Sequence, residues 1–418
     1  MQLEDLMSYQ DFAFRYFGMA PRFEWPDRRT VAPKQTATRQ IIWVVGALSL
    51  AYQSLGTIIY WAVFNSQPKE IDMYVAKIAE MGSVLGLTLI GFLNICTLTY
   101  KRPKIEVVLA ELQELYPEPR RRYFRIRHYN EQGVGLMKFV TMFYVILVLY
   151  YNIAPLVILL WEHHMDSQDI SYRAQSYTWY PWRVHGSVLG YAAAYLSQAI
   201  GGTVAVGFSM SIQHLICLFT VQLELHFDAL ASQLTGLDAK EFTANEQLRF
   251  LITYHLRILR LADQINRLFD FTFMISLVVS TFAICLTSVA MLLLDLNTAL
   301  QYVSGLIAFV IHHFLICYRG SVVTVSMVGM FLFIIYTFSK CHDGTQVTMA
   351  SDKVMPAAFY NNWYEGDLAY RKMLLMLMMC STKPYIWRTY NLANVSIETY
   401  MATLKLSYQM FTFARSLK

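Results

Sequence analysis

The chain has 418 residues, of which 56 % are hydrophobic and 15 % are charged, and its mean hydropathy is +0.36. A soluble globular protein carries about 25 % charged residues, so this composition indicates a membrane protein. The net charge of +5 is spread over several connections without a long basic run, which argues against a nucleic-acid partner.

The N-terminal segment is polar and basic. Residues 1–40 carry six Lys and Arg residues and a Pro-containing turn, but no apolar core of signal-peptide length. We therefore expect no cleavage and assign residues 1–40 to a cytoplasmic N-terminal segment. The six cysteines of the chain lie in hydrophobic segments or in Lys/Arg-rich connections, so a disulfide framework is not implied.

Uncharged apolar stretches of about 20 residues, the length that crosses a bilayer as a helix, recur along the chain. They predict an all-α polytopic membrane protein with seven transmembrane helices at residues 41–64, 81–100, 139–161, 186–212, 271–294, 296–318 and 395–417. Connections rich and poor in Lys and Arg alternate between them, and the rich ones belong in the cytoplasm. This pattern predicts a cytoplasmic N-terminus and an extracellular C-terminus, opposite to a G-protein-coupled receptor.

The connection 220–270 does not have the composition of a loop. Apolar residues recur in it at helical spacing, with charged residues on the other side. We expect the fourth and fifth spans to continue into the cytoplasm as helices, which either assemble subunits or pack on their own chain. The apolar positions are Leu251, Tyr254, His255, Ile258, Leu261 and Ile265.

A further apolar run, residues 322–338, lies between the sixth and the seventh predicted spans. The chain carries seven Lys and Arg residues between the sixth and the last span, from Arg319 to Arg388. Counting the run as an eighth span would place six of these cations outside the cell. The charge pattern therefore argues against an eighth span.

The last predicted span carries a polar stripe. Lysine near the centre of a bilayer costs about 2.5–3.5 kcal/mol, so such a stripe is stable only against water or protein. It indicates either an aqueous pore lined by several subunits or polar contacts between helices of one subunit, and Thr403 and Ser407 on the opposite face leave both open. The residues of the stripe are Glu398, Ala402, Lys405, Gln409, Thr412 and Ser416.

Two segments near the C-terminus resemble the insect odorant receptor family. They are residues 357–384, AAFYNNWYEGDLAYRKMLLMLMMCSTKP, and residues 383–418, KPYIWRTYNLANVSIETYMATLKLSYQMFTFARSLK. The span count and the orientation agree with this family over the whole chain. The related gustatory receptors have five hydrophobic residues between Thr-Tyr and Gln-Phe, whereas here eight residues separate Tyr400 from Gln409 and Met410 follows. The odorant branch therefore fits better.

This resemblance implies an odorant-tuning subunit of a ligand-gated, non-selective cation channel. Such a channel is a heterotetramer with an obligate co-receptor in the plasma membrane of the olfactory neuron dendrite. Each subunit would give its last helix, residues 395–418, to a central pore with Phe413 at the hydrophobic gate. Lys405 would lie in the wider cytoplasmic vestibule or pair across a subunit boundary. The expected pore-lining residues are Lys405, Gln409, Thr412, Phe413 and Ser416.

One feature departs from the family. Family members read approximately Cys-Tyr-Arg-Gly and then Thr-x-Val-Thr, a small residue and Ser, but here CYRG ends at Gly320 and TQVTMAS begins at Thr345. We hypothesise that residues 321–344 are a translated intron or a gene-model error, the alternative being a real insertion that extends the sixth helix. Residues 41–318 would then hold the first six helices with the pocket and the helical extensions, and residues 345–394 a cytoplasmic anchor segment.

The family resemblance also implies where a volatile ligand binds. The pocket lies in the outer half of the membrane, among the second, third, fourth and sixth spans, and is mostly apolar with aromatic walls. A single aromatic residue in a transmembrane helix is more often a packing residue or an interfacial anchor. The residues expected at the ligand are Met81, Val84, Leu85, Tyr144, Val148, Tyr151, Tyr191, Tyr195, Ala199 and Tyr302.

Other signals in the sequence are weak. The histidines of WEHHMD (161–166) and IHH (311–313) offer too few ligands on one helix face for a metal site. Motifs of nucleotide-binding or catalytic sites are missing, so neither an enzyme nor a cofactor is expected. A secondary transporter, the rival class, should show paired repeats with broken helices, whereas glycines are enriched only in the fourth span.

Overall fold

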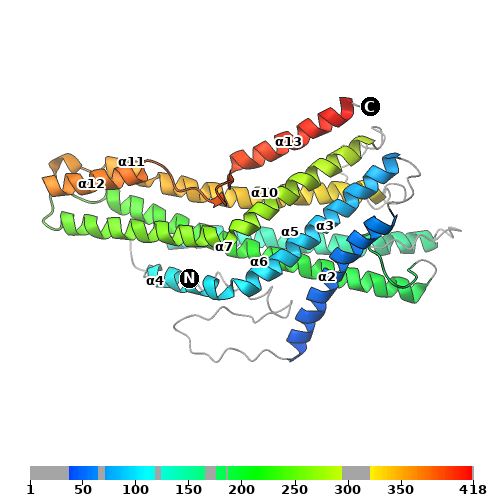
Figure 1. Ribbon diagram of the computed structural model, residues 1–418. Coiled ribbons are helices and arrows are strands. Elements are labelled where there is room, and N and C mark those ends of the chain that lie inside the picture. Colours follow the sequence, from blue (N-terminus) through cyan, green and yellow to red (C-terminus); the bar gives the residue numbers. More distant parts are fainter. Residues whose placement is uncertain are drawn as a thin grey trace.

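The computed structural model describes residues 37–64, 71–117, 124–164, 176–184, 187–293 and 321–416 as an elongated bundle of helices (Figure 1). The long helices are α2 (Ala37–Phe64), α3 (Ile71–Tyr100), α5 (Ile126–His164), α6 (Val188–Thr235), α7 (Ala244–Leu293), α10 (Ser321–Asp352) and α13 (Ile397–Ser416). The shorter elements are α4 (Arg102–Leu115), α11 (Val354–Phe359), η1 (Trp363–Glu365), α12 (Leu368–Ser381), β1 (Arg388–Thr389) and β2 (Ala393–Asn394). The two strands pair antiparallel just before α13.

Six of the seven predicted spans fall on helices of the structure. They correspond to α2, α3, α5, α6, α7 and α13. The sixth predicted span, residues 296–318, lies outside the described residues, as do the histidines at 311–313 and most of the N-terminal segment. The structure also continues the fourth and fifth spans as helices, because α6 extends to Thr235 and α7 begins at Ala244.

Length and hydropathy single out four described helices that can cross a membrane. The apolar stretches are Trp43–Val63, Ile126–Ile153, Val188–Thr235 and Ala244–Leu286. The bent pair of α3 and α4 adds a fifth if it is counted as one span. The bend between these two helices is 65° and falls where Lys101 separates them and Pro103 opens α4. Proline suits the first turn of a helix, where its missing N–H costs no hydrogen bond, so a new helix begins there.

Helix α6 is the centre of the bundle. Residues 204–227 are buried on every side, and α2, α3, α5, α7 and α10 all contact the helix. A helix that is apolar all round is stable only when protein surrounds it. Helix α3 crosses α6 closely at Gly91, where an added Cβ would lie 2.5 Å from the Cβ of Ala205. Small residues at this crossing let the two backbones approach each other.

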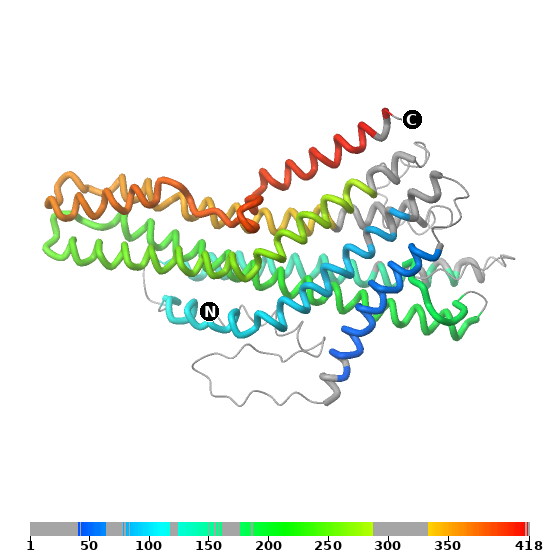
Figure 2. The backbone as a smooth tube through the Cα atoms, in the orientation of Figure 1, coloured from blue at the N-terminus to red at the C-terminus, as the bar shows by residue number. Residues whose placement is uncertain are grey.

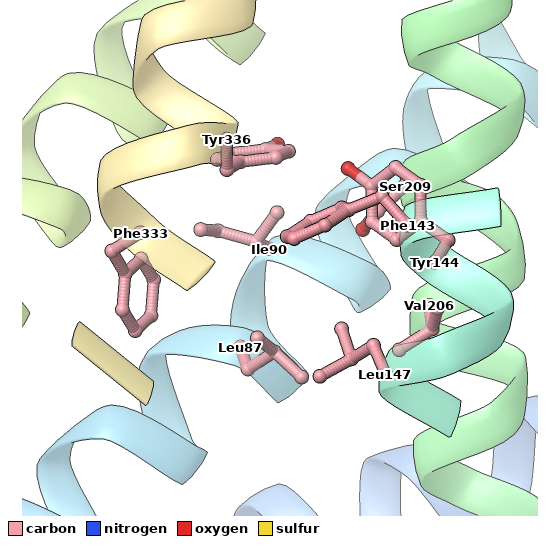
Figure 3. Close-up of a pocket in the computed structure, with 9 residues that line it drawn as sticks. All are labelled: Leu87, Ile90, Phe143, Tyr144, Leu147, Val206, Ser209, Phe333 and Tyr336. Carbon is pink, nitrogen blue, oxygen red and sulfur yellow. The ribbon is translucent and has the colours of Figure 1, made fainter. Parts of the chain in front are cut away.

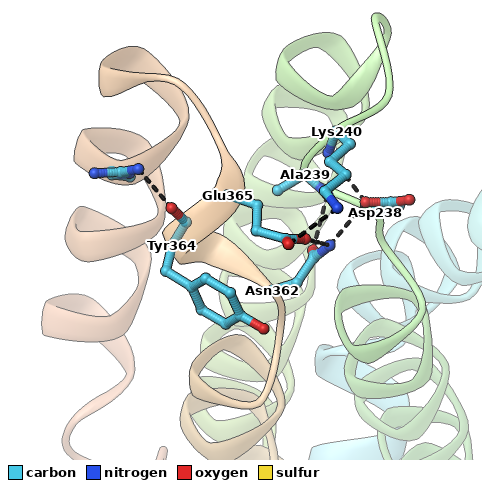
Figure 4. Close-up of polar contacts among 7 residues, drawn as sticks. Asp238, Ala239, Lys240, Asn362, Tyr364 and Glu365 are labelled. Atoms are coloured by element: carbon cyan, nitrogen blue, oxygen red, sulfur yellow. Dashed lines mark hydrogen bonds and ion pairs between the residues drawn. The ribbon is translucent and has the colours of Figure 1, made fainter.

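The ends of α6 and α7 that join each other form one end of the molecule together with α11 and α12 (Figure 2). The turn between α6 and α7 is held by residues of the AAFYNNWYEGD motif (Figure 4). Asn362 donates a hydrogen bond to Asp238 (2.7 Å) and accepts one from the backbone of Ala239 (2.9 Å), and Lys240 pairs with Glu365 (3.0 Å). The amide of Asn362 and the backbone N–H of Lys240 hold the pKa of Asp238 below its ordinary value. This motif therefore fixes the hairpin of α11 and α12 to the hairpin of α6 and α7.

Asn361 is the buried member of this contact. Its side-chain amide donates to the carbonyl oxygens of Leu234 (2.8 Å) and Leu237 (2.9 Å), which end α6. Replacing Asn361 with Ala leaves both carbonyls without that donor, and we expect a loss of about 1–3 kcal/mol in the free energy of unfolding. Thermal unfolding of the purified protein measures this loss. Asn394→Ala, at an exposed strand position, is the control and should leave the midpoint unchanged; equal midpoints for the two variants would contradict the prediction.

Residues 321–344, the expected insertion, form most of helix α10. The helix contacts α3, α6, α7 and α13. Phe333, Tyr336, Lys340 and Asp343 are all buried in these contacts. The Asp343 carboxylate accepts a hydrogen bond from Gln213 of α6 at 2.8 Å. The segment is therefore part of the packed bundle, which speaks against treating it as foreign to the fold.

Candidate functional site

A cavity lies inside the bundle, between α3, α5, α6 and α10 (Figure 3). The wall is mainly aliphatic and aromatic, with three hydroxyl-bearing side chains. In Figure 3, Tyr336 and Ser209 lie in the upper part of the cavity, and Leu87 and Leu147 lie in the lower part. The lining residues are Leu87, Ile90, Phe143, Tyr144, Leu147, Val206, Ser209, Phe333 and Tyr336.

A second cavity adjoins the first. The two share Leu87, Leu147, Val206 and Phe333 as a common wall. The second cavity reaches α2 and the segment 176–184, and so brings in more polar groups. Its further lining residues are Gln53, Val84, Thr88, Val148, Tyr151, Asn152, Ser176 and Gly202.

The segment 176–184 is tied to the bundle over this second cavity. The backbone of Ser176 exchanges two hydrogen bonds with the side chain of Gln198, each 3.1 Å long. The backbone N–H of Trp179 donates to the carbonyl of Gly56 at 2.9 Å, which fixes the segment to α2. Apolar walls with a few fixed polar groups are typical of a site for one small organic molecule.

Four of the expected ligand residues line the cavities: Val84, Tyr144, Val148 and Tyr151. Met81 and Leu85 lie close to Val84 in the sequence of α3, but they are not among the lining residues. On α6, the rings of Tyr191 and Tyr195 pack together at 5.8 Å, and the Tyr195 hydroxyl donates to the carbonyl of Asn152 on α5. Ala199 is half-buried on the same helix, and Tyr302 lies outside the described residues.

On α6, the residues expected at the ligand share one face with the residues that line the cavities, but the cavities lie further along the helix. The lining residues of α6 are Gly202, Val206 and Ser209, and Gly202 and Val206 stand seven residues after Tyr195 and Ala199. Seven residues are almost two full turns, so both sets share one face. Tyr195 braces α5 against α6 instead of lining the space.

Sequence reasoning missed the wall contributed by α10. Phe333 lines both cavities and Tyr336 lines the first, but both belong to the segment 321–344 that was set aside as an insertion. One signal was present in the sequence. Lys340 stands four residues after Tyr336 and two residues beyond the apolar run 322–338, and a lysine so close to such a run is stabilised by polar partners within the protein.

Helix α13 lies at the edge of the bundle, with one side against α7 and α10 (Figure 1). The buried side carries Thr403 and Ser407, and the Ser407 hydroxyl lies 3.4 Å from the Cys285 sulfur of α7. The residues expected to line a pore, Lys405, Gln409, Thr412, Phe413 and Ser416, are all exposed on the single chain. Contacts within the subunit therefore use the opposite face, and the polar stripe is free to meet water or another subunit.

Helix α10 joins the cavity to α13. Leu404 of α13 packs against the buried cluster that holds the cavity residues Tyr144, Phe333 and Tyr336. Close to the start of α13, the hydroxyl of Thr345 accepts a hydrogen bond from the backbone N–H of Ile397 at 2.9 Å. Contacts that involve α10 therefore reach both the beginning and the middle of α13.

These features define a class: a helical membrane protein that encloses a small-molecule cavity and presents a polar helix face outside its own bundle. Comparisons with known proteins narrow the class. The family model described as 7tm Odorant receptor matches residues 75–331 and 322–408. The chain belongs to the insect odorant receptor family.

Similar proteins cover the whole chain. "Putative odorant receptor 69a, isoform A" of Drosophila melanogaster is 46 % identical over 418 residues, covering 100 % of both chains, and isoform B is 43 % identical with the same coverage. Among solved structures, the insect olfactory receptor OR5 from Machilis hrabei in complex with eugenol has a TM-score of 0.72 at 15 % identity, covering 100 % of this chain and 99 % of that one. This structural similarity shows that the chain and that receptor share a fold.

Proposed function

We propose that the chain is the odorant-tuning subunit of a ligand-gated, non-selective cation channel. A volatile small molecule binds in the cavities between α3, α5, α6 and α10, and the exposed face of α13 lines a pore shared with an obligate co-receptor in a heterotetramer. The observation that carries this proposal is the double role of α10, which supplies a cavity wall and holds α13.

The proposal includes a location. The alternation of Lys/Arg-rich connections supports a plasma-membrane protein with a cytoplasmic N-terminus and an extracellular C-terminus, in the dendrite of an olfactory neuron. The Lys/Arg-rich segment 345–394 is cytoplasmic in this arrangement, and α13 leads outward.

Current recordings test the function directly. The chain is co-expressed with the co-receptor, and volatile esters, alcohols, aldehydes and aromatic compounds are applied while the membrane current is measured. We expect inward currents that depend on the volatile and disappear without this subunit. Silence to every volatile, with normal amounts of the subunit at the cell surface, would overturn the proposal.

The exposed face of α13 gives a prediction of its own. Cysteine placed at Gln409 or Thr412 should react with a water-soluble thiol reagent during agonist application, because these residues face the proposed pore. Ser407→Cys is the matched control on the same helix, since Ser407 is 3 % exposed and packs on α7. Block of the current in all three variants alike, or in none of them, would contradict a pore lined by this face.

The message that encodes α10 gives another prediction. The family match spans residues 322–408, and α10 supplies cavity residues, so we expect the transcript to retain the codons for residues 321–344. Sequencing the complementary DNA across this junction measures it. A message without these codons would restore the intron or gene-model hypothesis and remove Phe333 and Tyr336 from the site.

A further inference from the structure

Tyr336 places a hydroxyl at the wall of the first cavity, and a lysine stands behind it. Lys340 is 2 % exposed and lies one helical turn after Tyr336 on α10. The Lys340 amine nitrogen donates to the Tyr336 hydroxyl oxygen at 2.7 Å and to the Ser276 hydroxyl oxygen of α7 at 2.6 Å. The tyrosine oxygen therefore acts as an acceptor on the side that faces α7.

The hydrogen of the Tyr336 hydroxyl has only a weak partner in this arrangement. The hydroxyl of Ser276 donates its own hydrogen to the carbonyl of Thr272 at 2.5 Å. In the 3.2 Å contact between Ser276 and Tyr336, the tyrosine is therefore the donor, and this distance is long for a bond between hydroxyl groups. An acceptor atom in the cavity at about 2.7–2.8 Å would be the better partner.

Lys340 strengthens this donor. A hydroxyl that accepts a hydrogen bond becomes more polarised and donates more strongly, and the effect is larger in a low-dielectric interior. The nearby hydroxyl of Ser209 offers no comparable donor, because its hydrogen goes to the carbonyl of Ala205 at 2.9 Å while Asn94 donates to its oxygen at 3.1 Å. The remainder of the wall near Tyr336 is apolar, apart from the hydroxyl of Tyr144.

We propose that Tyr336 selects ligands that carry a carbonyl oxygen, with the hydroxyl of Tyr336 donating to that oxygen and Lys340 acting as the positioning residue behind it. The ligand class is volatile aldehydes, ketones and esters with one apolar chain, which the aliphatic wall of Leu87 and Leu147 accommodates. This proposal rests on the proposed function, in which the cavity is the odorant site.

The test uses the full chain with its co-receptor and sets of volatiles matched in heavy-atom number, each containing an aldehyde or ketone, the corresponding alcohol and the corresponding alkene. We expect the carbonyl compounds to activate the channel at the lowest concentrations. Tyr336→Phe keeps the ring and removes the donor. It should raise the half-maximal concentration of carbonyl compounds about 5- to 100-fold and leave that of the alkenes unchanged.

Two further variants give the control and the role of the lysine. Tyr360→Phe makes the same chemical change at an exposed residue outside both cavities and should leave the carbonyl response as it is. Lys340→Met should reduce the preference for carbonyl compounds over alkenes by a smaller factor than Tyr336→Phe does. The ratio of the response to carbonyl compounds over the response to alkenes separates a role in ligand selection from a loss of folded protein, because a loss of folded protein would lower all responses together.

The outcomes separate this inference from the function on which it rests. If Leu147→Trp, which fills the cavity, abolishes all responses while Tyr336→Phe changes none, the cavity is the odorant site and the carbonyl inference is wrong. Equal potency of alkenes and carbonyl compounds on the unmodified protein overturns it as well. If the channel is silent to every volatile, or if Leu147→Trp leaves all responses intact, the proposed site itself fails and the inference fails with it.

Discussion

Replacing Leu147 with tryptophan is expected to abolish the response to every activating volatile. Leu147 belongs to the wall that the two cavities share, so a larger ring at this position enters both spaces. Overpacking also costs about 1–3 kcal/mol where the neighbouring side chains cannot move. Because the ligand needs the same volume, we expect the half-maximal concentration to rise more than about 100-fold, which corresponds to about 2.7 kcal/mol.

Leu149→Trp is the matched control, because Leu149 lies two residues further on α5 and is 51 % exposed on the outer side of the bundle. Both variants are compared by dose–response curves after their amounts at the cell surface have been measured. Normal surface expression of Leu147→Trp with a lost response confirms the prediction. A response that Leu147→Trp leaves unchanged would exclude these cavities as the odorant site.

Replacing Gly344 with alanine is expected to destabilise the folded protein and thereby to lower the current, without a change in the cavities. A Cβ at Gly344 would lie 2.0 Å from the carbonyl oxygen of Val395, a backbone atom in the turn before α13. Val395 is itself buried, so the turn has little room to move away. The variant must separate α10 from the start of α13, at a cost of about 3 kcal/mol in stability. We expect the maximal current to fall at least about tenfold.

Gly135→Ala provides the comparison for this variant. Gly135 lies inside helix α5, and an added Cβ there meets no atom within 4 Å, so alanine should be neutral or slightly stabilising. Surface expression and maximal current are measured for both variants. If Gly344→Ala behaves as Gly135→Ala does, the close approach of α10 and α13 is not required for folding or for channel opening.

Under the proposed function, the contacts of α10 give a route from the ligand to the pore. A ligand in the first cavity would touch Phe333 or Tyr336, and the same helix contacts α13 through Thr345 and the close approach at Gly344. The ring of Phe338 also packs against Tyr400 of α13, with ring centroids 5.5 Å apart. A ligand opens such a channel only if it binds the open arrangement of these helices more tightly than the closed one.

The last helix shows how far periodicity alone can be read. The spacing of Lys405, Gln409 and Thr412 placed these residues on one face, and that face is the exposed one in the structure. Thr403 and Ser407 made the pattern ambiguous, because a polar side chain in an apolar helix can face a pore or a neighbouring helix. Only the position of α13 against α7 and α10 assigned them to the packed side.

The cavity shows where the sequence is less informative. Tyr144, Val148 and Tyr151 were expected at the ligand on α5, and the structure places all three in the lining. On α6, the same reasoning chose Tyr191 and Tyr195, which lie nearer the N-terminal end of the helix than the lining residues Gly202, Val206 and Ser209. Lining and packing use the same apolar and aromatic residues, so composition cannot distinguish depth along a helix.

The amino-acid sequence by itself determined the membrane class, most of the long helices and the polar face of the last helix, because hydropathy, charge alternation and helical period are local properties of the chain. The family was indicated by the resemblance of residues 357–418. Tertiary structure alone decided that α10 belongs to the bundle, that Phe333 and Tyr336 stand at the cavity and that Lys340 lies behind Tyr336. These placements depend on contacts between segments far apart in the chain, such as Lys340 with Ser276 and Thr345 with Ile397. The two partners of each contact are far apart in the sequence, so no local pattern pairs them.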